Sequence, residues 1–542
     1  MEKQLDSLPG AKLSSVTYDP LRVCLSGTRT ELLKDIKEWI DFGDTSERIL
    51  WLSGAAGTGK SSVANSIAKK MDSLARLGAS FRFDRSQADR TPTAFIGNVC
   101  RQVAGFNDSL KKAIHAAFTR HGGSGTCAFQ AEKLFVEPLL KAKHFGQIVI
   151  VIDALDESTD DQSVTGGTSR EDLIRIIVEQ FPRLPPTVKL MITSREEGYI
   201  TDRMSKCPCK HLRIADAPGI EADIQAFIED EMGQVRESKR GPDWPGADKI
   251  NALKEYADNL FICAAVTCNF IKKGRNPDLQ MKKVLDSSRP EQFMALDGLY
   301  MIVLKQSLEG RQVEGESGLD WRRVIGAIAT VWTPLTVKEM DALLGLPTES
   351  LYSTWDYISP LQPLLKDEAK VHKVQLLHKT VFDFLRTQTI IPIDIPVRHY
   401  ELAGDCLTYM NKNLRYDMSW ISSSEPSSQF NTSTLRYACR SFSKHLSESI
   451  LGRPSSANEP RIGLTDTREL RIFLTEHLLH WFETMARLKE NYEAERSLKL
   501  LSSCLSVSFG FRRQLQFVDI TRRHRLLFSR LKSKMITRFD YF

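Results

Sequence analysis

A short apolar run leads directly into a glycine-rich loop near the start of the chain. Residues 49–53 read Ile-Leu-Trp-Leu-Ser, and residues 54–61 read Gly-Ala-Ala-Gly-Thr-Gly-Lys-Ser, which fits the pattern G-x-x-x-x-G-K-[ST]. Apolar residues then recur at helical spacing from Val63 to Met71. A strand, a glycine-rich loop and a helix in this order predict a phosphate-binding loop, because backbone N–H groups and a helix N-terminus attract anions. The first part of the chain should therefore adopt an α/β fold.

The loop supplies most of the predicted ligand contacts. We expect Lys60 to reach the β- and γ-phosphates of a nucleotide and the Ser61 hydroxyl to ligate Mg²⁺. The predicted phosphate-contacting residues are Gly54, Ala55, Ala56, Gly57, Thr58, Gly59, Lys60, Ser61 and Ser62. A glycine-rich turn without a ligand is the alternative, but it gives no reason for Lys-Ser at the start of a helix.

Three further segments predict strands, namely a continuous apolar run at residues 148–152 and shorter, mostly apolar segments at 79–83 and 188–192. Amphipathic patterns between them predict helices, one following Thr30, two or three within 92–143 and one near 169–181. Strands that alternate with helices predict a doubly wound parallel sheet. Ligands of such sheets lie at the carboxyl ends of the strands.

Charged residues follow two of these predicted strands. Asp153 comes directly after residues 148–152, and we expect it to hold Mg²⁺ directly or through water. Asp156 or Glu157 could polarise the attacking water as general base, with Asp156 ranked first and Glu157 close behind. Arg195 follows the strand at 188–192, where a cation could sense or neutralise a γ-phosphate. A solvated acidic turn and a surface arginine are the corresponding structural alternatives.

Composition limits the class of protein. The 542 residues are 42% hydrophobic and 26% charged, and no apolar run approaches the ~20 residues of a membrane span. No signal peptide is recognisable at the N-terminus, so we expect a cytoplasmic location, or a nuclear one. The ten scattered cysteines should be reduced. Residues 207–211, Cys-Pro-Cys-Lys-His, are crowded like metal ligands, but no second Cys/His pair lies at zinc-site spacing.

The rest of the chain is predominantly helical in pattern. A short strand within Val371–Leu377, followed by a helix around Val381, suggests a winged-helix module. We predict an N-terminal segment (1–28), a nucleotide-binding domain (29–215), a helical domain (216–300), a winged-helix-like domain (301–395), a helical region (396–510) and a basic tail (511–542). From Thr521 onward the tail carries seven basic residues against one aspartate. A solvated terminus explains that charge better than nucleic-acid binding does.

The motifs resemble those of the NACHT NTPases, above all the nephrocystin-like branch abundant in fungi. The resembling segments in the nucleotide-binding part are 27–29, 51–61, 79–81, 152–157 and 193–195. Further along, the resembling segments are 256–262, 376–385, 437–439, 444–446 and 480–483. The resemblance covers approximately residues 20–505.

This resemblance implies a STAND-class signalling switch, ADP-bound at rest and ATP-bound when active, which often self-assembles. It implies that Gly27, Thr28 and Arg29 line the adenine site and that His378, in the winged helix, touches the ADP β-phosphate. The resembling proteins commonly have an N-terminal effector region and C-terminal WD40 repeats. Neither pattern occurs in this sequence, so we expect a short or truncated, repeat-free form.

The resulting expectation is a Mg²⁺-dependent ATP-binding switch or oligomerisation module with slow hydrolysis. The alternative is a non-hydrolysing scaffold in which nucleotide is a structural ligand. A small-molecule kinase is less consistent with several hundred helical residues, and a GTPase would need an N-K-x-D motif, which is absent. The expected partners are nucleotide, further copies of the chain and unidentified effector or sensor proteins.

Overall fold

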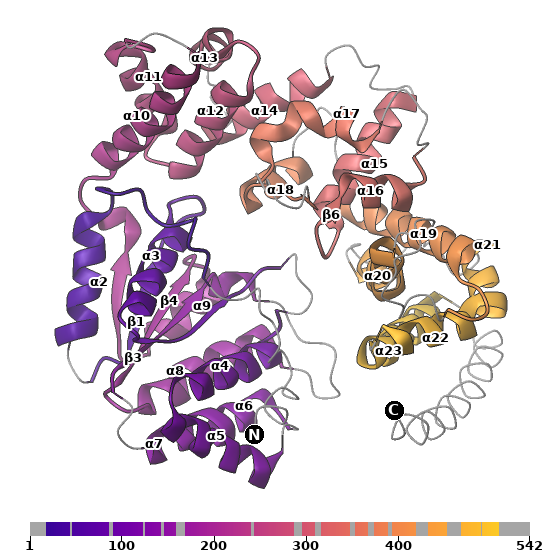
Figure 1. Ribbon diagram of the computed structural model, residues 1–542, viewed down its shortest axis with the longest axis horizontal. Coiled ribbons are helices and arrows are strands. Elements are labelled where there is room, and N and C mark those ends of the chain that lie inside the picture. The colour runs from indigo at the N-terminus through magenta and orange to yellow at the C-terminus, as the bar shows by residue number, and fades with distance from the viewer. Residues whose placement is uncertain are drawn as a thin grey trace. The chain divides into compact units, whose positions relative to one another are not determined.

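The computed structural model describes residues 18–43, 46–85, 90–122, 125–142, 146–158, 168–239, 243–286, 295–308, 316–346, 353–366, 373–387, 393–418, 432–451, 468–488 and 490–508 (Figure 1). The chain divides into two compact units. The first comprises residues 1–309, 360–366 and 376–384, and the second comprises 310–359, 367–375 and 385–542. The predicted basic tail and most of the predicted N-terminal segment lie outside the described residues.

A five-stranded parallel sheet forms the centre of the first unit (Figure 1). Its strands are β1 (Ile49–Ser53), β2 (Leu77–Arg82), β3 (Ile148–Asp153), β4 (Val188–Ser194) and β5 (Cys209–Arg213). They lie in the order β2-β3-β4-β1-β5, and every neighbouring pair is parallel. The doubly wound parallel sheet predicted from the sequence is confirmed. The carboxyl ends of β1, β3 and β4, where ligands are expected, lie at one edge of the sheet.

Alternate residues of the strands enter two separate hydrophobic clusters. Leu50, Val151 and Met191 pack with the helices α2 (Thr30–Phe42) and α3 (Lys60–Ser73) on one face. Trp51 and Ile152 belong to the cluster on the other face, which also contains residues of α4 (Pro92–Phe106) and α8 (Arg170–Gln180). Because β1, β3 and β4 are buried on both faces, their sequences are predominantly apolar, with Lys189 of β4 as a buried exception.

Strand β5 is not predicted by the sequence. Its residues are half-buried or exposed along their whole length, because β5 forms the edge of the sheet beside β1. The Cys-Pro-Cys-Lys-His crowding therefore belongs to the start of an edge strand. Among the described residues, no group of three or more His, Cys, Asp or Glu side chains could hold a metal ion.

The remaining helices of the first unit follow the strands and then form a helical region. Around the sheet these are α5 (Asp108–His121), α6 (Cys127–Gln130), η2 (Ala131–Val136), α7 (Glu137–Lys141), η3 (Leu155–Glu157), η4 (Phe181–Arg183), α9 (Gly198–Met204) and η5 (Ile214–Asp216). The helical region contains α10 (Ile220–Lys239), α11 (Ala247–Ala257), α12 (Phe261–Lys273), α13 (Pro277–Leu285), α14 (Ala295–Leu308) and η6 (Ser359–Leu364). The N-terminal part of α18 (Lys379–Thr387) also belongs to the first unit.

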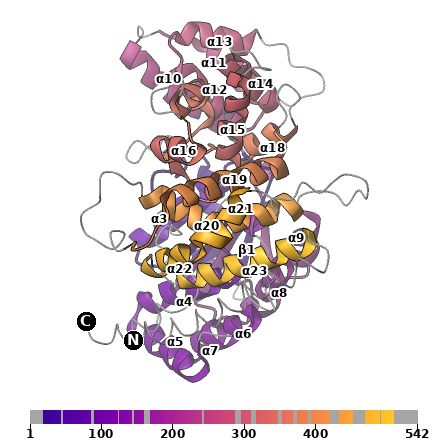
Figure 2. The same cartoon turned by 90° about the vertical axis from the view of Figure 1, so that its right-hand side faces the viewer.

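The described part of the second unit is helical apart from one short antiparallel pair of strands. Its elements are α15 (Glu316–Thr330), β6 (Leu335–Thr336), α16 (Val337–Leu344), α17 (Thr354–Ile358), β7 (Lys373–Val374), α19 (Ile395–Asn413), α20 (Thr432–Leu451), α21 (Arg468–Ile472), η9 (Phe473–His477), α22 (Leu478–Arg487) and α23 (Asn491–Ser508). Strands β6 and β7 pair antiparallel, so the short strand expected within 371–377 is present. Helix α20 packs along α19 and against α23 (Figure 2).

A chain of buried polar side chains lies inside the second unit. The Nδ1 atoms of His399 and His445 are 2.8 Å apart, and His445 Nε2 is 2.8 Å from the Tyr437 hydroxyl. The Trp332 ring stacks on both imidazoles. Burial lowers the pKa of His399 to about 4 and also holds that of His445 well below its ordinary value. Two neutral imidazoles, each with one N–H, supply the hydrogens for the hydrogen bonds that link these side chains.

Candidate phosphate-binding site

The glycine-rich loop joins β1 to α3 in the predicted order. Gly57 and Gly59 have positive φ angles of 79° and 93°, which a residue with a Cβ rarely adopts. Gly59 is the N-cap of α3 and offers no side-chain acceptor to the first N–H groups of that helix. Ser61 and Ser62 lie in the first turn of α3. The local sequence therefore aims backbone N–H groups at the carboxyl end of β1, which is the arrangement that binds phosphate.

Lys60 lies folded over this loop. Its Nζ donates hydrogen bonds to the carbonyl oxygens of Gly54 and Ala55, both at 2.7 Å. Burial lowers the pKa of Lys60 to about 8; Asp156 opposes this shift and Arg195 adds to it. Phosphate oxygens can replace the two carbonyls as acceptors, and their negative charge would favour the protonated amine.

Asp153 ends β3 beside the loop and contacts Ser61. The Ser61 hydroxyl donates to Asp153 Oδ1 at 3.1 Å, and the Thr193 hydroxyl donates to the same oxygen at 2.6 Å. Asp153 Oδ2 is buried and accepts no hydrogen bond within the described part of the chain. A hydroxyl beside a carboxylate oxygen that lacks a hydrogen bond is a donor set that suits Mg²⁺. The residues present therefore fit the predicted metal ion.

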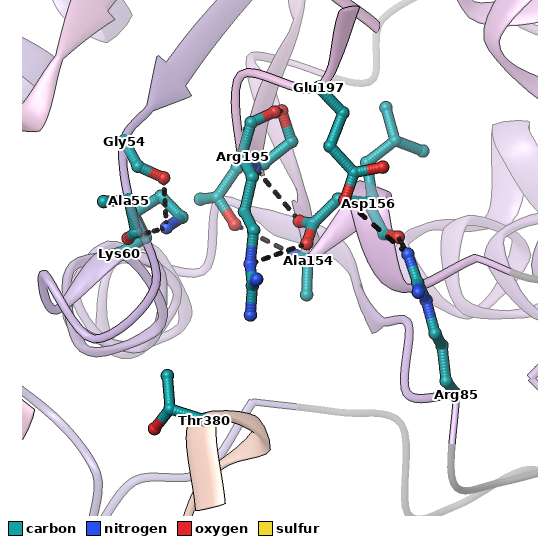
Figure 3. A network of polar contacts seen from close by, with 12 residues as sticks. Gly54, Ala55, Lys60, Arg85, Ala154, Asp156, Arg195, Glu197 and Thr380 are labelled. Atoms are coloured by element: carbon teal, nitrogen blue, oxygen red, sulfur yellow. Dashed lines mark hydrogen bonds and ion pairs between the residues drawn. The ribbon is translucent and has the colours of Figure 1, made fainter. Parts of the chain in front are cut away.

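Arg195 and Asp156 are bonded to each other. The Arg195 backbone N–H donates to Asp156 Oδ1 at 3.1 Å, and Arg195 Nε lies 3.3 Å from Oδ2. The Arg195 side chain extends between Lys60 and Asp156 (Figure 3). Asp156 is only 2% exposed, whereas Glu157, the next residue, is partly exposed. The ion pair holds Asp156 as the partner of Arg195.

Residues that the sequence did not single out support this part of the site. Arg85 and Arg170 both donate to the Asp156 carbonyl oxygen, and Arg170 also pairs with Glu197 at 2.8 Å. Glu197 lies 3.7 Å from Arg85 as well (Figure 3). Two arginines and one glutamate thus fix the turn that carries Asp156 and Glu157. The sequence offers no signal for them, since they come from three separate segments without a recognisable motif.

The Gly27–Arg29 segment contacts the phosphate loop through Arg29. This side chain is buried, and its Nη2 donates to the Thr58 carbonyl oxygen at 3.0 Å. The guanidinium also lies 5.0 Å from the centre of the Phe261 ring and 3.8 Å from Asp223. Thr28 is buried beside it and donates to the Leu25 carbonyl oxygen. Arg29 therefore links the loop to α10 and α12, and a role for Gly27, Thr28 and Arg29 in adenine binding stays a prediction.

His378 immediately precedes α18 in the first unit. The Thr380 backbone N–H donates to His378 Nδ1 at 3.2 Å, so the neutral imidazole carries its proton on Nε2. The Thr380 hydroxyl lies 2.9 Å from the same nitrogen and 2.7 Å from the Tyr300 hydroxyl. Burial lowers the pKa of His378 to about 3, with Arg195, Arg82 and Lys60 contributing through their charge. The imidazole is thus a neutral donor in the electric field of several nearby cations.

None of the described helices is both long enough and apolar enough to span a membrane.

Comparisons with known proteins agree with this geometry. A family model described as "Nephrocystin 3, N-terminal" matches residues 27–195. The vegetative incompatibility protein HET-E-1 of Podospora anserina is 21% identical over 520 residues, which cover 86% of this chain and 35% of that protein. This chain thus spans about a third of the length of that curated relative.

Solved structures give weaker matches. A Walker-type ATPase of Pyrococcus abyssi is 13% identical with a TM-score of 0.33, over 66% of this chain and 95% of that one. A point mutant of RuvB from Thermotoga maritima is 13% identical with a TM-score of 0.24, over 71% and 99% of the two chains. Scores this low do not bear on function. Residues 27–195 are thus similar to the nephrocystin 3 N-terminal family, and the observed parallel sheet with its phosphate loop agrees with the fold of a NACHT-like P-loop NTPase domain.

Proposed function

We propose that this chain binds ATP and ADP with Mg²⁺ and acts as a nucleotide-controlled switch that hydrolyses ATP slowly. The observation that carries the proposal is the convergence of Lys60, the Ser61–Asp153 pair and the Arg195–Asp156 pair at the ends of three neighbouring strands. Cationic, hydroxyl and carboxylate groups in this order match the parts that phosphoryl transfer requires.

Each side chain has a role that its contacts support. Lys60 and the loop N–H groups bind the β- and γ-phosphates, and Ser61 and Asp153 hold Mg²⁺, which neutralises phosphate charge when bound. Arg195, oriented by Asp156, stabilises charge on the transferred phosphoryl group. The burial and ion pairing of Asp156 favour the partly exposed Glu157 as the carboxylate that accepts the proton of the attacking water.

In this proposal, His378 couples the nucleotide bound at the loop to the position of the segment that carries α18. Because the Thr380 N–H donates to Nδ1, the imidazole proton is on Nε2, where it is available to a ligand as a hydrogen-bond donor. A diphosphate bound at the loop would offset the charge of Lys60, Arg82 and Arg195, which removes part of the repulsion on a protonated imidazole. Loss or displacement of that contact on nucleotide exchange would release the segment that carries α18. Similarity to HET-E-1 supports extending the proposal to an intracellular signalling role with self-association.

A non-hydrolysing nucleotide-bound scaffold is the second candidate. It is favoured by the ion pair that occupies Asp156, because a carboxylate held by Arg195 is a poor proton acceptor. Nucleotide would then act as a structural ligand; at 100 times its Kd it would add about 2.7 kcal/mol to the free energy of unfolding. The two candidates differ in whether Glu157 supports turnover.

The test compares bound nucleotide and steady-state phosphate release in the full chain and its variants. We expect ADP or ATP to co-purify with the wild type and with Lys70→Ala, an exposed lysine on the same helix as Lys60. Lys60→Ala should lower nucleotide affinity on the order of 100-fold, because charge-assisted hydrogen bonds are lost. His378→Ala should release bound ADP faster than the wild type does.

Glu157→Gln should retain ATP and lower phosphate release on the order of 100-fold, as expected for loss of a general base. Phosphate release that equals the Lys60→Ala background in the wild type, with nucleotide bound, would select the scaffold. A folded wild-type chain that binds neither nucleotide would refute both candidates.

A further inference from the structure

Arg82 is the last residue of β2 and lies directly beside Asp153. The two residues are register partners in the parallel pair β2–β3. Arg82 Nε is 3.7 Å from Asp153 Oδ2; the arginine side chain is 34% exposed, and that of Asp153 is 8% exposed. Neither the phosphate-loop pattern nor the acidic motif after β3 includes Arg82, so the sequence did not suggest a role for it.

The contact between Arg82 and Asp153 is an ion pair without a hydrogen bond. Charge-assisted N–H···O bonds are normally about 2.7–2.9 Å long, which is well below the 3.7 Å found here. Arg82 Nε and Asp153 Oδ2 are both buried, and neither makes a hydrogen bond within the described residues. The other carboxylate oxygen, Oδ1, accepts from Ser61 and Thr193. Two opposite charges therefore face each other while each retains capacity for another partner.

The backbone on which Arg82 sits is held from both sides. The Arg82 carbonyl oxygen accepts a hydrogen bond from Arg90 at 2.7 Å, and the N–H of Phe83 donates to the Asp153 carbonyl oxygen at 2.9 Å. Arg90 is itself buried. Any change of partner at this position is therefore a change of side-chain rotamer, which requires no movement of the strand.

The positive charge of Arg82 affects the same side chain, His378, as the charges of Lys60 and Arg195. All three cations lower the pKa of His378 through their charge. They come from three different elements, the end of β2, the phosphate loop and the end of β4. Lys60 is bonded to loop carbonyls and Arg195 is bonded to Asp156, whereas Arg82 faces the oxygen of Asp153 that Mg²⁺ would take. Mg²⁺ on Oδ2 and the guanidinium of Arg82 therefore compete for one atom.

We propose that Arg82 discriminates a nucleoside triphosphate from a diphosphate. With a diphosphate bound, no third phosphate is present for the guanidinium to bind, so it stays beside Asp153. With Mg²⁺ and a triphosphate bound, Asp153 turns to the metal ion, and the guanidinium donates to oxygens of the terminal phosphate. The inference rests on the proposed nucleotide site and adds the residue that reads its third phosphate. Arginine suits this role, because its planar fork matches phosphate oxygens.

The experiment measures the Kd values for ADP and for a non-hydrolysable ATP analogue, both with Mg²⁺, in the full chain. Arg82→Gln should weaken binding of the analogue at least about tenfold while the ADP affinity changes less than about twofold. Arg82→Lys keeps a charge but loses the fork, so it should lower the ratio of analogue to ADP affinity at least about threefold. Should Arg82→Gln fail to fold, which its thermal unfolding would reveal, the Arg82→Lys ratio carries the test.

Arg76→Gln is the matched control. Arg76 immediately precedes β2, at the end of the strand away from Asp153, and also pairs with an aspartate, Asp41, at 2.8 Å. Its loss should leave the ratio of the two affinities unchanged.

An unchanged ratio in Arg82→Lys and Arg82→Gln, or an equal loss for both nucleotides, would overturn the assignment of Arg82 and leave the nucleotide site standing. Failure of the wild-type chain to bind either nucleotide would instead overturn the proposed function on which this inference rests.

Discussion

The phosphate site of the first unit and the histidine chain of the second unit both hold polar side chains away from solvent, yet they are built in opposite ways. The first contains charged groups, among which Asp153 Oδ2 and Arg82 Nε make no hydrogen bond in the described structure. The second contains His399, His445 and Tyr437, which are bonded to one another in a continuous chain.

Whether buried polar groups satisfy one another indicates which role they have. Charges that are close but incompletely bonded are costly unless a further ligand completes them, so they indicate binding. Neutral groups that satisfy one another need no ligand, so they indicate a contribution to folding. Mutations and pH should therefore act on nucleotide binding in the first unit and on unfolding in the second.

The largest expected effect is that of His445→Ala. The substitution leaves a cavity, removes the partner of His399 Nδ1 and removes one of the partners of the buried Tyr437 hydroxyl, which still accepts from the Trp332 N–H. We expect a loss of about 4 kcal/mol in the local unfolding free energy. Hydrogen exchange of the α19 and α20 amides measures this loss in the full chain. His480→Ala, at a partly exposed histidine of the same unit, should cost less than about 1 kcal/mol. A change in nucleotide affinity without a change in exchange would contradict the comparison.

A smaller decrease in the free energy of unfolding is expected when the pH is lowered. The folded-state pKa of His399 is lowered to about 4 from an ordinary value of 6.5. The unfolded chain therefore binds more protons between these values, and the stabilising contribution of neutral His399 is complete above pH 6.5 and is lost as pH falls toward 4. The loss amounts to about 3 kcal/mol.

The control for this acid effect is a His399→Gln variant. Burial raises the pKa of Asp405, in the same unit, to about 6, which acts with the opposite sign over the same pH range. The difference between the pH profiles of wild type and variant therefore isolates the histidine, with amide exchange of α19 as the measurement. Parallel profiles would show that His399 is not held neutral by the fold.

The smallest effect concerns Lys60, and it is a binding effect. Its pKa is lowered to about 8, while a bound polyphosphate requires the charged amine. Nucleotide affinity should therefore fall about tenfold per pH unit above pH 8, since one proton is taken up on binding. Titration calorimetry between pH 7 and 10 measures this, and Lys60→Ala should show no such slope. Constant wild-type affinity up to pH 10 would mean that Lys60 is fully charged without nucleotide.

The central strands were predictable because their burial leaves a direct trace in the sequence. Residues 148–152 are apolar without interruption, residues 49–53 and 188–192 are apolar except for Ser53 and Lys189, and each segment lies within a strand that is buried on both faces. The edge strand β5 could not be found in this way. Its residues Cys209–Arg213 are half-buried or exposed, so neither continuous nor alternating apolar character marks it.

The predicted site residues come together because the strand ends that carry them share one edge of the sheet. Ser61 meets Asp153, and Asp156 meets Arg195, as the order of motifs along parallel strands suggests. Arg82, Arg170 and Glu197 were missed because their importance depends on contacts across the fold. His445 lies in a segment that resembles the NACHT proteins, but its pairing with His399 depends on the packing of α20 against α19.

Gly57 connects two distant parts of the sequence. Its carbonyl oxygen accepts the Ile262 N–H at 3.1 Å, and a Cβ at position 57 would lie 2.1 Å from Ile262 Cγ2. The glycine at position 57 of the phosphate loop is therefore also required by its close packing against a helix some two hundred residues away in the sequence. During evolution of the chain, the residue types tolerated at position 57 should depend on the residue at position 262, and the reverse. Variation at Ile262 can then damage nucleotide binding although this side chain carries no charge.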